Sequence, residues 1–327
     1  MTACRICGNS VGNKTHAARE MMFGMRDVFH YLECASCGCV QLVDIPGDMS
    51  RYYPDRYYSF EEPEAFRKIG GDNPVARFLR NRRSAYLFEG ADMIGRFVSK
   101  IYPAQPKLLQ YVKLFKNCHA RLDSRILDVG SGQGKVLSEL AWYGFTDLTG
   151  VDRYIESDVR SGNVAILRRD IFSLDGTYDV IMFNHSFEHM DDPFAVLSKT
   201  GELLCDNGRV MIRIPTVSSY AWEHYGVNWV GLDAPRHLFL YSLKSMEILA
   251  QKAGFAIRAV LYDSTNFQIW GSEQYINDIP LRDERSYFEN PGKSIFTDAQ
   301  IKQFDRLIEE LNRDKRGDTV CVFLNKI

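Results

Sequence analysis

The 327-residue sequence lacks the features that mark membrane and exported proteins. It has no apolar stretch near 18 residues, the length that a membrane-spanning helix needs. Its N-terminus, Met-Thr-Ala-Cys-Arg-Ile-Cys, has no apolar core like that of a signal peptide. These two absences favour the cytoplasm, and no membrane partner is expected.

The sequence also lacks an excess of positive charge. Its formal net charge is −2, whereas proteins that bind nucleic acids usually carry a basic surplus. A nucleic acid partner is therefore not favoured, although a local basic run stands at residues 77–83. With 45% hydrophobic and 25% charged residues and no internal repeat, the composition is that of an ordinary globular protein.

Three regions follow one another along the chain. Residues 1–45 are punctuated by cysteine and glycine, and residues 46–120 show helical spacing of apolar residues between Ala76 and Tyr102. Residues 121–327 alternate between strand and helix patterns, which predicts a mostly parallel sheet with helices on both faces. The seven expected strands are 125–129, 147–151, 165–168, 178–184, 209–215, 255–262 and 319–324. The expected helices are 135–143, 193–204 and 243–253.

An insertion at about 267–316 separates the last two expected strands. It contains a strongly amphipathic helix candidate at 300–312. Two roles stay open for this insertion, a lid over a site and a contact within a homodimer.

A glycine-rich loop, Gly130-Ser-Gly132-Gln-Gly134, follows the strand at 125–129 and precedes a helix. Glycines allow a tight turn and the close approach of a ligand to the main chain. The helix N-terminus offers free N–H groups. Such a loop fits a nucleotide pyrophosphate as well as the amino-acid end of S-adenosylmethionine (SAM).

Three features bear on the choice between these ligands. The spacing is G-x-G-x-G, whereas the dinucleotide fingerprint is G-x-G-x-x-G. Asp128 ends the strand before the loop, where a carboxylate would repel a pyrophosphate but could hold the ammonium group of SAM. Asp152 ends the second strand and can accept both ribose hydroxyls. The third feature is shared with dinucleotide sites, so the first two favour SAM.

The segment Ile-Leu-Asp128-Val-Gly130-Ser-Gly132-Gln-Gly134 resembles motif I of the class I SAM-dependent methyltransferases, which have a Rossmann-like fold. Val151-Asp152 resembles their ribose-binding motif, and Arg169-Asp170-Ile171 resembles the motif whose acidic residue meets the adenine amino group. The segments 178–185, 188–193 and 235–239 follow in consistent order. The resemblance implies a SAM site made of Asp128, Gly130, Ser131, Gly132, Gly134, Asp152, Arg153, Asp170, Ile171 and Asn184.

Two C-x-x-C pairs, Cys4/Cys7 and Cys34/Cys37, stand near the N-terminus, each followed closely by a glycine. Four thiolates can close a tetrahedral zinc site that leaves no position for a substrate. A region of this size buries little core, so a structural zinc ion would supply its folding energy. A redox dithiol and coincidental buried cysteines are the alternatives, and Cys39 is a competing ligand that breaks the pair spacing.

The cysteine pairs ahead of the SAM motifs resemble bacterial sugar methyltransferases that carry an N-terminal four-cysteine zinc module. The aromatic segment 52–60 also looks like the one that follows this module. Deoxysugar C-methyltransferases of this kind carry a further Rossmann-like domain at the C-terminus. Since this sequence ends just after its last expected strand, methylation at carbon is not expected.

A hydroxyl acceptor needs a general base, and histidine suits neutral pH. His185 follows the fourth strand, His189 comes one helical turn later, and His237 lies in the loop after the fifth strand. His185 is the first candidate for the base and His237 the second, while a structural role is the alternative for each. Glu188 and His189 could instead ligate a divalent metal, as in some quinone-pathway methyltransferases that the segment resembles.

The aromatic candidates for an acceptor pocket, which also suit a core, are Tyr52, Tyr53, Tyr57, Tyr58, Trp222, Tyr225 and Trp229.

The sequence therefore predicts a SAM-dependent methyltransferase. The resemblance points to a small-molecule acceptor, foremost a hydroxyl of a sugar or sugar nucleotide in surface-polysaccharide or secondary metabolism. Two alternatives stay open, an RNA methyltransferase whose zinc ribbon grips nucleic acid and a non-catalytic SAM-binding scaffold. Asn184-His-Ser-Phe187 stands where amino-group methyltransferases of bases carry an Asn-Pro-Pro-Tyr-like motif, which disfavours the first alternative.

Overall fold

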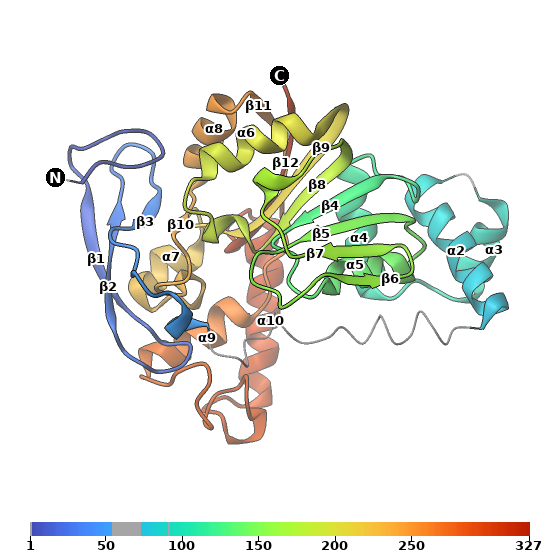
Figure 1. Cartoon of the computed structure of the whole chain (residues 1–327). Helices are drawn as coiled ribbons and strands as arrows, with labels where there is room; N and C mark the ends of the chain where they lie inside the picture. The colour runs from blue at the N-terminus through green and yellow to red at the C-terminus, as the bar shows by residue number, and fades with distance from the viewer. Residues whose placement is uncertain (1, 54–72, 91) are drawn as a thin grey trace.

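An eight-stranded sheet forms the centre of the computed structural model, which describes residues 2–53, 73–90 and 92–327 (Figure 1). Its strand order is β11-β12-β9-β8-β4-β5-β7-β6. The five parallel strands are β4 (Arg125–Val129), β5 (Asp147–Val151), β7 (Val164–Leu167), β8 (Tyr178–Asn184) and β9 (Leu204–Pro215). The antiparallel pairings involve β6 (Val159–Ser161), β11 (Phe255–Tyr262) and β12 (Thr319–Lys326).

The predicted mixed α/β class with a large, mostly parallel sheet is confirmed. The expected number of seven strands is one too few. The extra strand is β6, a three-residue strand that pairs with β7 across a turn at Gly162, whose φ is +59°. A strand this short carries too few residues to show an alternating pattern in the sequence.

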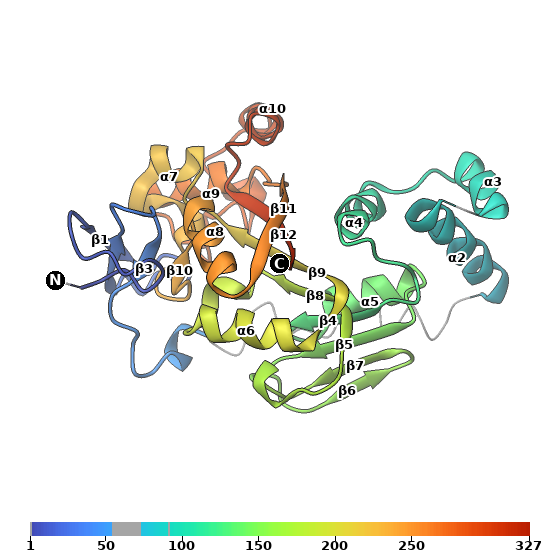
Figure 2. The same ribbon diagram turned by 90° about the horizontal axis from the view of Figure 1, so that it is seen from above.

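Helices cover both faces of the sheet (Figure 2). On one face, Ile126 and Val180 pack with α4 (Pro106–Asn117) and α5 (Lys135–Trp142). On the other face, Leu127 and Ile181 pack with α6 (Pro193–Leu203) and α8 (Leu243–Lys252). Successive residues of β4 and β8 thus point to opposite faces and are buried on both, as expected for the middle of a parallel sheet.

The expected helical region begins with a helical hairpin, α2 (Pro74–Glu89) and α3 (Met93–Ile101). The hairpin lies beyond the edge of the sheet and is connected to it through α4 (Figure 1). Tyr57 and Tyr58 fall outside the described residues. None of the helices that the structure describes is long and apolar enough to cross a membrane.

The N-terminal region forms a small antiparallel sheet from β1 (Lys14–Arg19), β2 (Val28–Glu33) and β3 (Val40–Leu42). Its fourth strand, β10 (Phe239–Leu240), comes from far along the chain and pairs with β3. A short 3-10 helix, η1 (Ser50–Tyr52), follows this sheet. The division of the chain at residues 45 and 120 stays a prediction, but the small sheet is built from both of the predicted outer parts.

The insertion between β11 and β12 contains α9 (Phe267–Ile276) and α10 (Asp298–Arg313). Helix α9 packs against α7 (Tyr220–Tyr225) and has most of its residues buried, so it belongs to the core. The backbone N–H groups of Leu281 and Arg282 donate to the carbonyls of Met21 and Met22 in the N-terminal region. Three short 3-10 helices complete this half of the chain: η5 (Gly226–Asn228), η6 (Val230–Leu232) and η7 (Pro291–Lys293).

Candidate functional site

The glycine-rich loop joins β4 to α5 through backbone conformations that favour glycine. The φ angles of Gly130, Gly132 and Gly134 are +75°, +52° and +78°. A Cβ atom on Gly130 would lie 2.5 Å from the Cβ of Ser186, which follows β8. Only glycine therefore lets the loop come this close to the end of β8, and α5 begins without a side-chain cap on its free N–H groups.

Asp128 is buried at the end of β4, with 2% of its surface exposed. Its Oδ1 atom has no hydrogen-bond donor among the residues that the structure describes. Burial, with a smaller contribution from the charge of Asp152, raises the pKa of Asp128 to about 8. A buried carboxylate without a donor favours a ligand that brings a positive charge or an N–H group.

Asp152 connects the end of β5 to the glycine-rich loop. Its Oδ2 accepts a hydrogen bond of 2.9 Å from the N–H of Gly132, and its Oδ1 accepts one of 2.8 Å from the N–H of Tyr154. Each carboxylate oxygen has a second lone pair that can accept a ligand hydroxyl. The position of Asp152 thus suits the hydroxyl-binding role expected from the sequence.

Asp170 follows β7 and caps the 3-10 helix η3 (Ile171–Ser173). Its Oδ1 accepts from the N–H of Phe172 at 3.0 Å, and its Oδ2 forms a salt bridge with Arg153. The side chain of Ile171 is buried beneath this corner. The expected cofactor residues therefore lie at the carboxyl ends of four strands, β7, β5, β4 and β8, which are neighbours in this order. Ligands of open α/β sheets bind at this edge.

His185 follows β8 and has a left-handed backbone conformation, with φ of +54°. Its Nε2 atom accepts a hydrogen bond of 2.5 Å from the Arg213 guanidinium, and its Nδ1 lies 3.5 Å from a carboxylate oxygen of Glu188. Arg213 also donates to Asp263 at 2.8 Å and is 3.5 Å from the Oδ1 of Asn184. Arg213 is not among the residues predicted from the sequence, although a charge inside the apolar segment 210–214 is a signal of such a role.

His189 and His237 meet at the same corner, with ring centroids 4.8 Å apart. Glu188 and His189 lie in the 3-10 helix η4 (Phe187–His189), and His237 lies just before β10. The Nδ1 of His189 is 2.8 Å from the carbonyl oxygen of Arg236, and that of His237 is 2.8 Å from the carbonyl oxygen of Gly231. The three predicted catalytic histidines are thus gathered around one residue, Glu188, which is completely buried.

A buried ion cluster holds the loop that carries His237. Arg236 is 1% exposed and donates to Asp233 at 2.6 Å and to Glu20 at 3.0 Å. It also donates to the carbonyl oxygen of Tyr52 at 3.2 Å. Glu20 follows β1, so the cluster joins the N-terminal sheet to this loop. This ion cluster was not predicted from the sequence, because Glu20 and Arg236 are 216 residues apart.

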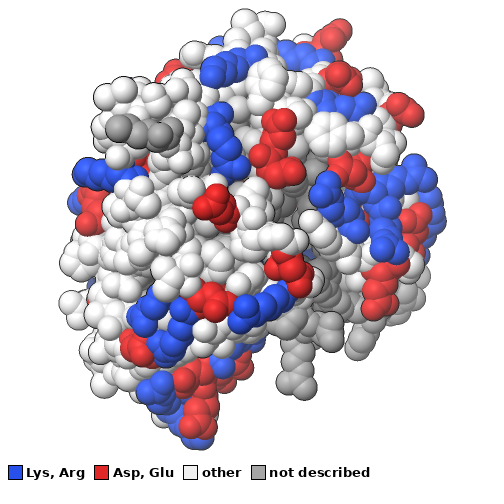
Figure 3. Space-filling model, turned by 60° about the vertical axis from the view of Figure 1, so that its left-hand side comes forward, with Lys and Arg blue, Asp and Glu red and all other residues white. Residues whose placement is uncertain are grey.

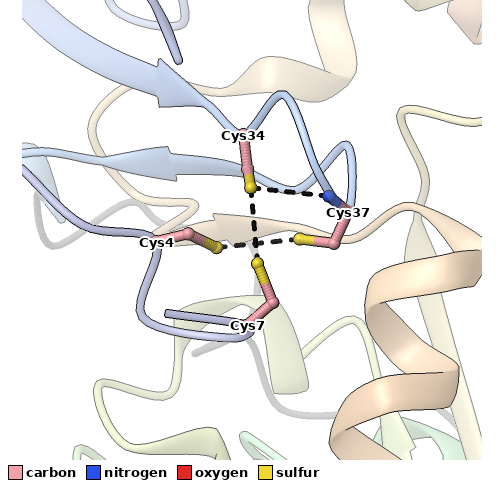
Figure 4. A group of neighbouring side chains, drawn as sticks. All are labelled: Cys4, Cys7, Cys34 and Cys37. Atoms are coloured by element: carbon pink, nitrogen blue, oxygen red, sulfur yellow. Dashed lines mark hydrogen bonds between the residues drawn. The ribbon is translucent and has the colours of Figure 1, made fainter. Parts of the chain in front are cut away.

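The four predicted metal ligands come together at one point (Figure 4). The Sγ atoms of Cys4 and Cys37 are 3.7 Å apart, those of Cys7 and Cys34 are 3.5 Å apart, and all four lie within 4.8 Å of one another. A tetrahedral zinc site with bonds of about 2.3 Å separates its sulfurs by roughly 3.8 Å. The arrangement therefore fits a tetrahedral metal ion without rearrangement of the backbone.

Local hydrogen bonds shape the two cysteine pairs. Gly8 and Gly38 have φ angles of +81° and +72°, and their N–H groups donate to the carbonyls of Cys4 and Cys34. The hydrogen bond with the Cys37 thiol lowers the pKa of Cys4 to about 5, in favour of the thiolate that binds metals. Cys39 is buried and donates weakly to the carbonyl of Val40, outside the four-sulfur cluster.

Three of the five described aromatic candidates for an acceptor pocket are buried core residues. Trp229 is completely buried and donates to Asp318 at 2.8 Å, and the Tyr225 hydroxyl donates to Glu273. Tyr52 is also buried, and its hydroxyl donates to Asp27. Trp222 contacts His16 edge to face. Tyr53 differs, because its hydroxyl lies 3.3 Å from the Nδ1 of His189 and so borders the histidine corner.

Comparison with known proteins identifies the central part of the chain. The family model described as "Methyltransferase domain" matches residues 92–260, which is over half of the chain. No curated protein matches the sequence. The matched segment begins at α3 and ends within β11, so it contains the glycine-rich loop and the histidine corner.

Solved methyltransferase structures show low similarity. A SAM-dependent methyltransferase from Mesorhizobium loti is 15% identical, with a TM-score of 0.40 over 62% of this chain and 91% of that one. One from Archaeoglobus fulgidus is 20% identical, with a TM-score of 0.39 over 72% and 100%. One from Thermotoga maritima, described as a possible histamine N-methyltransferase, is 17% identical, with a TM-score of 0.39 over 80% and 98%. Because these identities and TM-scores are low, the assignment of the chain to the methyltransferases depends on the family model.

Proposed function

Because the chain belongs to the methyltransferase-domain family and is a SAM-dependent methyltransferase, we propose that it transfers a methyl group to a hydroxyl of a small molecule, a sugar or sugar nucleotide. The observation that carries the SAM site is the buried Asp128 carboxyl group before the glycine-rich loop, whose Oδ1 has no hydrogen-bond donor among the described residues. SAM supplies an activated methyl group on a sulfonium, so the protein mainly aligns the acceptor and removes a proton.

The residues at the edge of the sheet fit the parts of SAM. Asp128 would pair with the ammonium group of SAM, which would supply a positive counter-charge for the buried carboxylate. Asp152 would accept from the ribose hydroxyls with its remaining lone pairs. Asp170 would accept from the adenine amino group, with Arg153 holding its other oxygen and the buried Ile171 supporting the corner.

We assign the proton-accepting role to His185. Its side chain is 36% exposed, against 12% for His237, so an acceptor can reach it more easily. Glu188 lies beside its Nδ1 and would stabilise the imidazolium that forms when Nε2 takes a proton. Nε2 faces Arg213 in the structure, so the acceptor hydroxyl would have to displace that guanidinium. His189 and His237 remain in the site as neighbours of Glu188, and a different role for them is argued below.

The charge distribution favours a small acceptor over RNA. On the face in Figure 3, lysine and arginine side chains alternate with aspartate and glutamate among the described residues. A surface that binds RNA would carry a continuous basic stripe. The formal net charge of −2 agrees with this reading.

Two further assignments belong to the same proposal. The four-cysteine cluster would bind structural zinc, since its sulfur spacing suits a tetrahedral ion. The cytoplasmic location expected from the sequence is a further part of the proposal. The proposal also includes assembly of the chain into a homodimer.

The decisive experiment measures transfer of a labelled methyl group from SAM to a panel of acceptors. The panel contains nucleotide sugars, free sugars, small phenols and transcribed RNA. We expect stoichiometric formation of S-adenosylhomocysteine with label in the nucleotide-sugar fraction. Label in RNA alone would contradict the small-acceptor proposal, and failure to bind SAM in calorimetry would contradict the catalytic one.

Replacement of His185 tests the base. His185→Ala should lower kcat by about 10²- to 10⁴-fold, the usual contribution of a general base, while the affinity for SAM stays unchanged. The matched control is His30→Ala, because His30 is exposed on β2. Wild-type turnover in His185→Ala with intact SAM affinity would remove His185 from this role.

A further inference from the structure

Glu188, His189 and His237 form a second group of metal-ligating side chains, separate from the cysteines. One carboxylate oxygen and one ring nitrogen from each histidine lie within 4.8 Å of one another. The Nε2 of His237 lies 3.8 Å from the Oε1 of Glu188. The group joins η4 to the loop before β10, which are 47 residues apart in the chain.

The Glu188 carboxylate has an unusual environment. Its side chain is completely buried, and neither oxygen has a hydrogen-bond donor among the described residues. Outside the proposed group, His185 also approaches this carboxylate. Its Nδ1 is 3.5 Å from the Oε1 of Glu188, which is longer than a good hydrogen bond. A buried carboxylate held only by such longer contacts to histidine rings is costly, so a positive ligand between these groups would offset a large desolvation penalty.

Backbone carbonyls fix the orientation of both imidazole rings. The carbonyl oxygen of Arg236 is 2.8 Å from the Nδ1 of His189, and that of Gly231 is 2.8 Å from the Nδ1 of His237. A carbonyl only accepts hydrogen bonds, so each Nδ1 carries the proton and each Nε2 carries the lone pair in the neutral ring. Metal-binding histidines are held in this way, because a hydrogen bond to one nitrogen fixes the tautomer for the other.

Supporting residues make the site rigid. Arg236, whose carbonyl holds His189, is anchored by its own side chain to Asp233 and Glu20. The Oδ2 of Asp233 lies 3.9 Å from the Nε2 of His237, and the charge of Asp233 is neutralised by Arg236. The loop that brings His237 to Glu188 is thus fixed by buried ion pairs, which preorganises the three ligands.

We propose that Glu188, His189 and His237 bind one divalent transition-metal cation in addition to the metal of the cysteine cluster. Two imidazoles and one carboxylate suit zinc, manganese, iron or cobalt, and three protein ligands leave coordination positions open to water or another oxygen. The open positions would take the acceptor hydroxyl beside His185, a step that rests on the proposed function. Binding of the cation itself needs neither SAM nor an acceptor.

The test uses the full-length protein with its cysteine cluster loaded with zinc and with weakly bound metal removed by a chelator. Mn²⁺ is then titrated in, and the electron paramagnetic resonance signal of free Mn²⁺ reports what is bound. Thiolates bind Mn²⁺ poorly, so the cysteine cluster does not compete for this probe. We expect one Mn²⁺ per chain, with coupling of the bound ion to imidazole nitrogen in pulsed spectra.

Two substitutions locate the site. Glu188→Gln keeps the side-chain size and should weaken Mn²⁺ binding by at least about tenfold, a loss that removal of even a supporting residue reaches at metal sites. His30→Asn on exposed β2 is the control and should bind as the wild type does. Unchanged zinc content and SAM affinity show that the variant is folded.

Three results would overturn the proposal. They are the absence of stoichiometric Mn²⁺ binding to the wild type, bound Mn²⁺ without nitrogen coupling, and wild-type affinity in Glu188→Gln. The first two are measured on the unmodified protein, so they do not depend on the folding of a variant. Methyl transfer is measured separately, so a failure of the metal site and a failure of the proposed function give different outcomes.

Discussion

Replacement of Arg236 by leucine should destabilise the protein strongly, because two acids would lose their buried counter-charge. Arg236 is 2.6 Å from Asp233 and 3.0 Å from Glu20, and both Arg236 and Glu20 are essentially inaccessible. At an effective dielectric constant of about 20, each contact has a gross attraction of roughly 6 kcal/mol. Desolvation cancels much of this attraction, but removal of one partner leaves uncompensated charge.

The net loss expected for Arg236→Leu is about 3–5 kcal/mol in the free energy of unfolding, the usual range for a broken buried pair. Burial disfavours the ionised form of Asp233, and the charge of Arg236 outweighs this effect and lowers the pKa of Asp233. Without Arg236 that pKa should rise. Glu20→Gln should cost less, because Arg236 keeps Asp233 and the turn at Phe23 and Met25 keeps an acceptor.

Urea unfolding followed by circular dichroism measures these values. The matched control is Arg258→Leu, since Arg258 is exposed on β11, and it should change stability by less than about 0.5 kcal/mol. In the double variant with Glu20→Gln, the two losses should not add, because they share one interaction. An Arg236→Leu protein as stable as the control would refute the argument that this cluster holds the N-terminal sheet to the His237 loop.

Three further predictions concern single groups. Because the pKa of Asp128 is raised to about 8, its carboxyl is protonated below that pH, so SAM binding near pH 7 should release a proton and strengthen by up to about tenfold per pH unit toward pH 8. Calorimetry in two buffers checks this, and buffer-independent enthalpies would contradict it. Burial raises the pKa of Asp318 to about 6, so its contribution to stability is lost as pH rises from about 4 to 6. Asp318→Asn should remove that dependence in thermal unfolding and add up to about 3 kcal/mol at pH 7; a profile that still falls over this range would argue against it. Cys4→Ser should lose the single zinc ion found by elemental analysis while Cys205→Ser keeps it, and full zinc content in Cys4→Ser would show that the cluster is not the site.

The central sheet was predictable from local pattern. The strands β4, β5 and β8 begin and end where the apolar runs do, because a buried parallel strand is apolar on both faces. The antiparallel edge strand β11 also has the predicted bounds. The strand β9 begins at Leu204, whereas the sequence predicted a start at residue 209. The prediction was late because Asp206, Asn207 and Gly208 are typical of a turn.

The histidine corner was predictable only in part. Two features of the sequence indicated His185, His189 and His237. These residues follow expected strands, and histidine suits a general base at neutral pH. The partners that decide their roles come from elsewhere in the chain: Arg213 from inside a strand and Arg236 through its contact with Glu20. Such contacts depend on how distant segments pack, and a single sequence carries no periodic signal for them.

The pairing of β10 with β3 has a consequence for synthesis of the protein. The N-terminal cysteines leave the ribosome early, but Glu20 meets Arg236 only after 216 more residues have been added. At about 5–20 residues per second, this delay is about 10–40 s. During that time the edge of β3 is unpaired and Glu20 has no counter-ion. A metal ion captured by the first forty residues would then keep this segment folded while it waits for the strand that completes its sheet.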